Sequence, residues 1–271
     1  MKHKQKNIPI KNIPKIEPLF IKSFKLAKNN LNKIGLMILF DAMFLVSFFA
    51  VYKLFKYYAD SLALPKTFAT GLIFIVFSLI YYLIILLIYS FFKYNILDSI
   101  KSLFDRTESS FKRLGQFYSL DIIIAGIFFA IMIVINAILA GIKQSYAPFI
   151  FIFLIVPYAL FLYVVLNASH SAFYQGTSIK ESLKKGFKLT FTKIKVYRET
   201  ILIIILFALV LWLLFLGSGY LVRLAAYNNY SLYLKWYAYF KQTTIIIFDL
   251  VMYFAILINR ISFYDLAREY R

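Results

Sequence analysis

Six long apolar blocks constrain the fold of this chain more than any other feature of its sequence. A helix needs about 20 apolar residues to cross the hydrocarbon core of a bilayer, and 62% of the residues here are hydrophobic. Backbone polar groups cannot stay unpaired in lipid, and no alternating strand pattern of about ten residues occurs, so helices must be the spanning elements. We expect an all-α polytopic membrane bundle of about six transmembrane helices in three hairpins, with basic amphipathic helices on the cytoplasmic surface. The predicted spans lie at about 34–53, 69–92, 119–142, 149–168, 200–222 and 244–260.

The 31 Lys and Arg residues are distributed unevenly about these blocks. With the N-terminus inside, the N-terminal tail, the two long inner loops and the C-terminal segment hold 24 of them, and the outer loops hold 7. Inner loops of membrane proteins are rich in Lys and Arg, so both termini are expected in the cytoplasm. The net charge of +19 then sets topology and attracts anionic lipid head groups, and no nucleic-acid partner is expected. The wealth of Ile, Lys, Asn, Phe and Tyr indicates AT-rich coding, which favours a prokaryotic plasma membrane.

The most basic internal segment, residues 176–199, has the pattern of an amphipathic helix. Ser178 and Glu181 form the S-x-x-E pattern of a capping box, which begins a helix. One face of this helix would carry Ile179, Leu183, Gly186, Phe187 and Thr190. A cationic amphipathic helix between two spans is typical of a belt on the membrane surface. The side chains expected to bind anionic lipid are Lys180, Lys184, Lys185 and Lys188.

The chain divides into a basic tail that contains three prolines, residues 1–18, and a single membrane domain, residues 19–271. Proline every few residues prevents a helix in the tail. A basic segment precedes each expected hairpin, and these segments share a short phrase: SFKLAKNN from Ser23, SFKRLGQF from Ser110 and GFKLTFTK from Gly186. The similarity of these three stretches predicts a threefold repeat over 19–92, 96–168 and 176–260. The alternative is that Lys-rich inner segments of similar composition look alike by chance.

Two carboxylates lie inside predicted spans, where ionisable groups are costly and mark functional candidates. Asp41 lies in the inner half of the first span, from which it could reach Arg260 or His170. Asp249 lies in the outer half of the last span, and we expect it to pair with Arg223. These groups either form charge pairs that fix helix packing or act as carboxylates that bind a proton or a cation.

Other polar residues near the span ends have simpler interpretations. Asp121 and Glu199 stand at the inner starts of two spans, where a carboxylate complements the helix dipole. His170, at the inner end of the fourth span, is expected to be solvated or hydrogen-bonded to a neighbour, and no zinc site is expected around it. The aromatic outer segment 223–243 is interpreted as an interfacial belt, with an outer lid or a partner-docking surface as the alternative.

The run GTSIKESLKKGFKLT, residues 176–190, resembles the membrane domain of the glycerophosphoryl diester phosphodiesterase family and related prokaryotic multi-span proteins of unknown function. The resemblance covers the pattern of basic segment and hairpin across the chain, with identifiable phrasing only in this run. It implies an α-helical bundle of about six spans and supplies no catalytic residue. The phosphodiesterase activity of that family resides in a separate soluble barrel, for which the longest inner loop here, about 30 residues, leaves no room.

Motifs for several reaction classes do not occur in the sequence. There is no G-x-x-x-x-G-K-[ST] loop, no H-E-x-x-H and no G-x-S-x-G, and the chain contains no cysteine. We therefore expect a non-enzymatic membrane module without a cofactor or metal, which binds anionic lipid and docks a membrane or cytoplasmic protein partner. The alternative is a small-solute or lipid transporter that uses Asp41 or Asp249.

Overall fold

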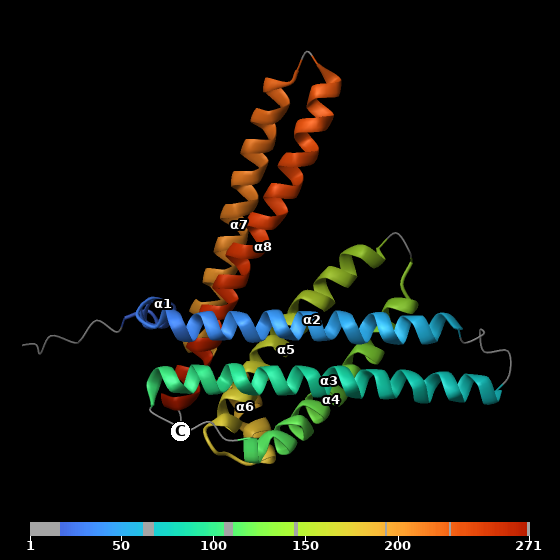
Figure 1. The fold of residues 1–271 in the computed structure, drawn as a ribbon, viewed down its shortest axis with the longest axis vertical. Coiled ribbons are helices and arrows are strands. Elements are labelled where there is room, and N and C mark those ends of the chain that lie inside the picture. The colour runs from blue at the N-terminus through green and yellow to red at the C-terminus, as the bar shows by residue number, and fades with distance from the viewer. Residues whose placement is uncertain are drawn as a thin grey trace, which may run out of the picture.

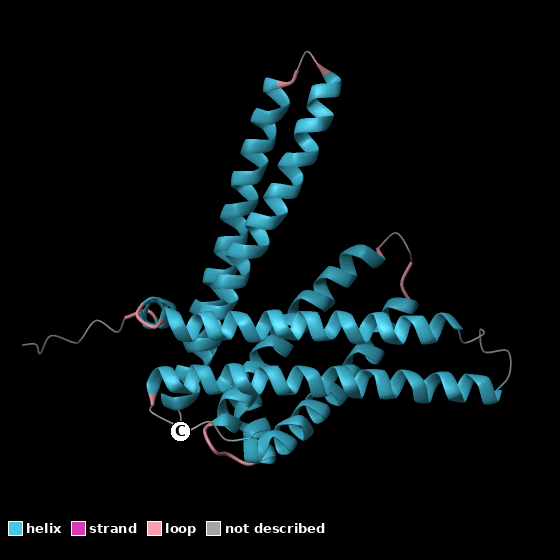
Figure 2. Cartoon of the chain, viewed as in Figure 1, coloured by secondary structure: helices cyan, strands magenta, loops and turns pink. Residues whose placement is uncertain are grey.

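A computed structural model describes residues 17–61, 68–105, 111–143, 146–192, 194–227 and 229–269, and every regular element in these ranges is helical (Figure 2). Six of the helices are long and apolar enough to cross a membrane, which confirms the all-α polytopic bundle. Residues 1–16 of the expected tail lie outside the described residues. The elements are α1 Leu19–Lys28, α2 Leu31–Ser61, α3 Phe68–Phe104, η1 Phe111–Arg113, α4 Leu114–Ala140, α5 Ala147–Tyr174, α6 Ile179–Thr192, α7 Ile194–Ala225 and α8 Tyr230–Glu269.

The six long helices form three hairpins, α2 with α3, α4 with α5, and α7 with α8. The hairpins splay away from one another in their outer parts and meet at one end (Figure 1). We call this end the base. There, α1 packs against α2, α7 and α8, and α6 packs against α4, α5 and α7.

The buried core lies in the base. Fully buried side chains come from every hairpin that enters it, among them Met37, Ile100, Phe117, Leu120 and Leu257. The outer parts of the spans are mostly exposed, and none of the most apolar stretch of α3 is buried. Lipid tails are as apolar as these side chains, so burial of apolar surface gives the outer parts little reason to pack together.

All six long helices exceed the predicted spans, α3 and α8 by the most. The second span continues to Phe104, because Ile96, Leu97 and Ile100 keep an apolar face against the base. The middle basic segment is therefore the end of α3 followed by the short turn η1, and only α1 and α6 form separate amphipathic helices in the described chain. The threefold repeat stays a prediction. At the other end of the molecule, α8 begins at Tyr230, so the aromatic outer segment is largely helical.

The turn between α5 and α6 folds α6 back onto α5. Gly176 has φ of 101°, a left-handed conformation that glycine adopts at helix ends without steric cost. The predicted capping box forms: the backbone N–H of Ser178 donates to Glu181 Oε2, and the N–H of Glu181 donates to Ser178 Oγ, both at 3.3 Å.

The packed face of α6 contains small residues that allow a close approach to α5. Ser182, Gly186 and Thr190 are buried, and the larger side chains of this face pack against the core. A Cβ atom added at Gly186 would overlap the Ser169 hydroxyl and would lie 3.1 Å from the Val165 carbonyl oxygen. The apolar face of α6 thus packs on protein, not on the lipid surface as expected from the sequence.

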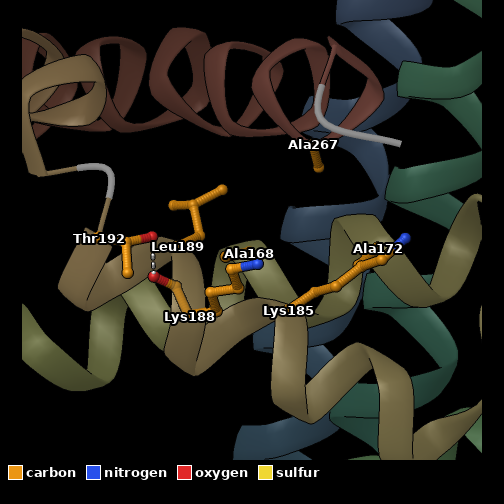
Figure 3. Close-up of a pocket in the computed structure, with 7 residues that line it drawn as sticks. All are labelled: Ala168, Ala172, Lys185, Lys188, Leu189, Thr192 and Ala267. Atoms are coloured by element: carbon orange, nitrogen blue, oxygen red, sulfur yellow. Dashed lines mark hydrogen bonds between the residues drawn. The ribbon is translucent and has the colours of Figure 1, made fainter.

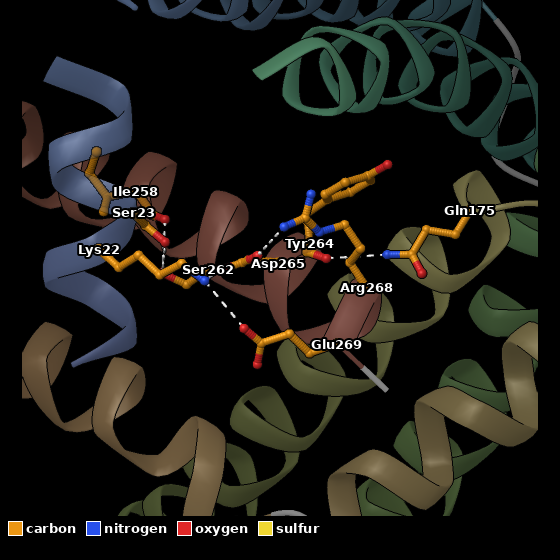
Figure 4. Close-up of polar contacts among 9 residues, drawn as sticks. All are labelled: Lys22, Ser23, Gln175, Ile258, Ser262, Tyr264, Asp265, Arg268 and Glu269. Atoms are coloured by element: carbon orange, nitrogen blue, oxygen red, sulfur yellow. Dashed lines mark hydrogen bonds and ion pairs between the residues drawn. The ribbon is translucent and has the colours of Figure 1, made fainter. Parts of the chain in front are cut away.

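Helix α1 is held to α8 by a polar cluster (Figure 4). Lys22 Nζ lies 2.5 Å from Asp265 Oδ2 and 3.2 Å from Glu269 Oε1. Asp265 is 1% exposed, and Arg268 also approaches it, at 3.5 Å. Beside these ion pairs, the Ser262 hydroxyl donates to Ser23 Oγ at 2.9 Å. The cluster places α1 across the end of α8.

Replacement of Gly186 by alanine should loosen α6. The overlap with Ser169 is expected to cost about 1–3 kcal/mol, which outweighs a gain in helix propensity of up to about 1 kcal/mol. Thermal unfolding of the full chain in neutral detergent measures the effect. Gly126→Ala is the matched control, because nothing lies within 4 Å of a Cβ at that position. A second change, Ser169→Gly, should restore part of the stability of Gly186→Ala, and the absence of such coupling would contradict the close contact.

Replacement of Lys22 by methionine should release α1. Lys22 is partly exposed but Asp265 is buried, so the loss exceeds that of an exposed pair and is about 1–2 kcal/mol. Hydrogen exchange of amides in 19–28 should therefore accelerate about tenfold. Lys25→Met is the control, since Lys25 pairs only with exposed Glu17 among the described residues.

The Lys22–Asp265 pair also predicts a pH dependence. The pKa of Lys22 is raised above 10.5, chiefly because Asp265 accepts its hydrogen bond. The contribution of the pair is therefore complete below pH 10.5 and is lost only as the pH rises through the raised value. Protection of α1 between pH 7 and 10, corrected for intrinsic exchange, should stay constant in the native protein.

Candidate functional site

A buried polar network crosses the base between the hairpins. Its centre is Asp121 of α4, whose Oδ1 lies 2.6 Å from His170 Nε2 of α5. Ser90 of α3 donates to Asp121 Oδ2 at 2.5 Å. All three side chains are at most 2% exposed. A buried carboxylate needs such partners because isolation from water is costly, so this trio fixes α3, α4 and α5 relative to one another.

The second part of the network joins α2 to α8. Arg260 Nη1 donates to Asp41 Oδ2 at 2.7 Å, and Tyr253 Oη donates to the same oxygen at 2.8 Å. The Asp41 and Arg260 side chains are 16% and 20% exposed. Asp41 was expected to reach either Arg260 or His170. In the structure it pairs with Arg260, and His170 is hydrogen-bonded to Asp121 instead.

Lys93 of α3 lies between these two parts. It is 5% exposed and its Nζ lies 3.3 Å from Asn167 Oδ1 of α5. It is also within electrostatic reach of Arg260, Asp41 and Asp121. The network therefore holds two carboxylates and two basic side chains, and Asp41 and Arg260 form an ion pair within it.

A hydrogen bond joins His170 Nε2 to Asp121 Oδ1. The Nδ1 atom of His170 has no hydrogen-bond partner in the described part of the chain. The bond through Nε2 therefore fixes the orientation of both side chains between α4 and α5. Tyr89 covers the His170 ring, with centroids 6.2 Å apart.

Asp121, His170 and Ser90 are closed to solvent, whereas Asp41 and Arg260 each keep a small exposed fraction. Five pockets on the described surface are lined by other residues. Among the described residues, no group of three His, Cys, Asp or Glu side chains is placed to hold a metal ion. The hydrogen bonds of the network join the three hairpins, because they connect α2 to α8 and α3 to α4 and α5.

The expected pair between Asp249 and Arg223 does not form in the described structure. Both side chains are exposed, and neither belongs to an ion pair there. The reason is the length of α8, which starts at Tyr230. Asp249 therefore lies about 28 Å along the helix from the turn, at 1.5 Å per residue, whereas Arg223 lies beside the turn.

The interpretations of Asp121 and His170 are corrected in part. Helix α4 begins at Leu114, so Asp121 lies beyond the first turn and serves as a buried partner instead of complementing the helix dipole. His170 is hydrogen-bonded to a neighbour, as one alternative expected, but it is fully buried and not solvated. Lys93 was not predicted as a site residue, because the predicted span ends at residue 92 and leaves it in a loop. The apolar spacing that continues α3 beyond this residue was the available signal.

The lysines expected to bind lipid lie on the outward side of α6. Lys180, Lys184 and Lys188 are exposed and Lys185 is half-buried. None of the four forms an ion pair with the described residues. Lys185 and Lys188 line a pocket between α5, α6 and the end of α8 (Figure 3). These lysines thus concentrate positive charge on the edge of the base, with no ion pair to a described carboxylate.

Six apolar helices define the chain as a multi-pass integral membrane protein. Comparison of the sequence and structure with family models, curated proteins and solved structures gives no match. Its function must therefore be inferred from the arrangement of its own residues.

Replacement of Asp41 by asparagine should destabilise the protein. Arg260 would lose its carboxylate partner in a partly buried place, for which we expect a loss of about 2 kcal/mol. The matched control is Asp249→Asn, which removes a carboxylate at an exposed position of the span and should change the stability by less than about 0.5 kcal/mol. Unfolding of both variants in neutral detergent measures the difference, and equal effects would contradict a structural role for the Asp41 pair.

Proposed function

We propose that this protein is a non-enzymatic membrane module that binds anionic lipid head groups through the lysine face of α6. The observation that carries the proposal is the division of α6 into two sides. Ser182, Gly186 and Thr190 hold the helix against α5, while the opposite side presents lysines without a described acidic partner. A basic residue near an anionic membrane surface contributes about 1 kcal/mol to attraction.

The proposal includes an orientation. In the sequence, the N-terminal tail, the two long inner loops and the C-terminal segment carry 24 of the 31 Lys and Arg residues, and such segments face the cytoplasm. We therefore propose that α1 and α6 lie at the inner leaflet of the plasma membrane, where anionic lipids give the surface its negative potential. The lysine face of α6 would then lie at the depth of the head groups.

Transport by an intramembrane carboxylate has less support. A carboxylate that carries a proton or a solute has to be reached from water. Asp41 is engaged by Arg260 and Tyr253, and Asp249 is exposed on α8. Neither position combines a free carboxylate with one of the described pockets.

The test is substitution of the four α6 lysines by glutamine in the full chain. The affinity for acyl-labelled phosphatidylglycerol in neutral detergent micelles, followed by fluorescence anisotropy at low salt, should fall more than about tenfold, because about 1 kcal/mol is lost per lysine. Phosphatidylcholine should bind both proteins alike. The difference should shrink as salt is added.

The matched control removes four exposed lysines from the outer parts of the hairpins: Lys53, Lys56, Lys235 and Lys241. It has the same net charge as the α6 variant. If the two variants lose the same affinity, attraction depends on total charge and the proposal for α6 is wrong.

A further inference from the structure

We propose that the pocket between α5, α6 and α8 is a discrete binding site for the phosphate group of an anionic phospholipid. This inference rests on the proposed function and makes it more specific. The inference assigns one binding site for one head group, in place of general attraction to the membrane surface.

The shape of the pocket comes from small side chains. Ala168 and Ala172 of α5 and Ala267 of α8 line it and leave a cavity of about 320 Å³. The three alanines are at most 8% exposed, so the helices around the cavity are packed and the space is preformed. In a preformed site, binding does not have to order the surrounding chain.

The charge of the pocket comes from two neighbouring lysines. Lys185 and Lys188 extend from α6 past Ala168 and Ala172, with Ala267 on the far side of the cavity (Figure 3). Neither lysine forms an ion pair or a side-chain hydrogen bond with the described residues. The acidic residues at the end of α8, Asp265 and Glu269, pair instead with Lys22. Two free ammonium groups at one cavity favour an anion with several oxygens, and lysine is a common phosphate ligand.

The walls favour a lipid over free phosphate. Alanine methyl groups, Leu189 and the aliphatic stems of the lysines give the site an apolar lining. A small hydrated anion gains nothing from such walls, whereas the glycerol and first acyl carbons of a phospholipid can pack against them. The cavity also lies in the base, beside spans whose exposed surface is apolar.

The experiment compares two lysine pairs of equal charge on the same helix. The full chain in neutral detergent micelles is titrated with acyl-labelled phosphatidylglycerol at about 1 M salt, where the Debye length is about 3 Å and exposed charges are screened. Lys185→Gln with Lys188→Gln should weaken binding at least about tenfold, since each loses a charge-assisted contact. Lys180→Gln with Lys184→Gln should change it less than about twofold.

A third variant tests the cavity itself. Ala267→Leu fills the space and leaves every lysine in place, and it should also weaken binding at least about tenfold. Thermal unfolding establishes that this variant is folded. Normal phosphatidylglycerol affinity in a folded Ala267→Leu protein would overturn the proposed site.

The remaining outcomes separate the two proposals. Equal loss in both lysine pairs would overturn the discrete site and leave lipid binding by the whole α6 face intact. Both proposals would be overturned if neither double variant lost phosphatidylglycerol affinity at high salt and the four-lysine variant lost none at low salt. Displacement of the labelled lipid by millimolar inorganic phosphate would show that the site takes the free anion, which contradicts the lipid assignment.

Discussion

Contacts in the base, which are polar pairs, close helix packing and a buried apolar core, hold the hairpins of this protein together. Lipid solvates the outer parts of the spans as well as another helix would, and those parts are accordingly exposed in the structure. Contacts that lipid cannot replace are concentrated in the base: the ion pair of Asp41 with Arg260, the pair of Asp121 with His170, and the glycine contact between α6 and α5. The position of α6, and with it the lysine face, depends on these contacts.

Much of this architecture could be predicted from local patterns. Apolar length alone locates the spans, and the capping box and face of α6 follow from residues three and four apart along one helix. The Asp41–Arg260 pair was predictable as an alternative because both groups were assigned to the inner ends of spans. Each of these predictions uses a rule that acts within one helix or at one depth of the membrane.

The rest depended on how far helices continue and which faces meet. Lys93 became part of the site because α3 extends beyond the predicted span, and Asp249 lost its expected partner because α8 starts earlier than predicted. The pairing of Asp121 with His170 requires the rotation of α4 against α5, which no residue spacing in one segment specifies. The alanine-lined pocket likewise exists only where three helices meet, and single alanines carry no signal in the sequence.

Helix α8 has a mechanical consequence. It is the one long helix of the described chain without an internal glycine or proline, and these residues are the usual places where helices kink. Over 40 residues it extends about 60 Å, from the aromatic turn at one end to Arg260 and Ala267 at the other. A stiff rod of this kind cannot absorb a tilt by bending. Movement of its aromatic end is therefore transmitted along the helix to the Asp41–Arg260 ion pair and to the alanine-lined pocket in the base.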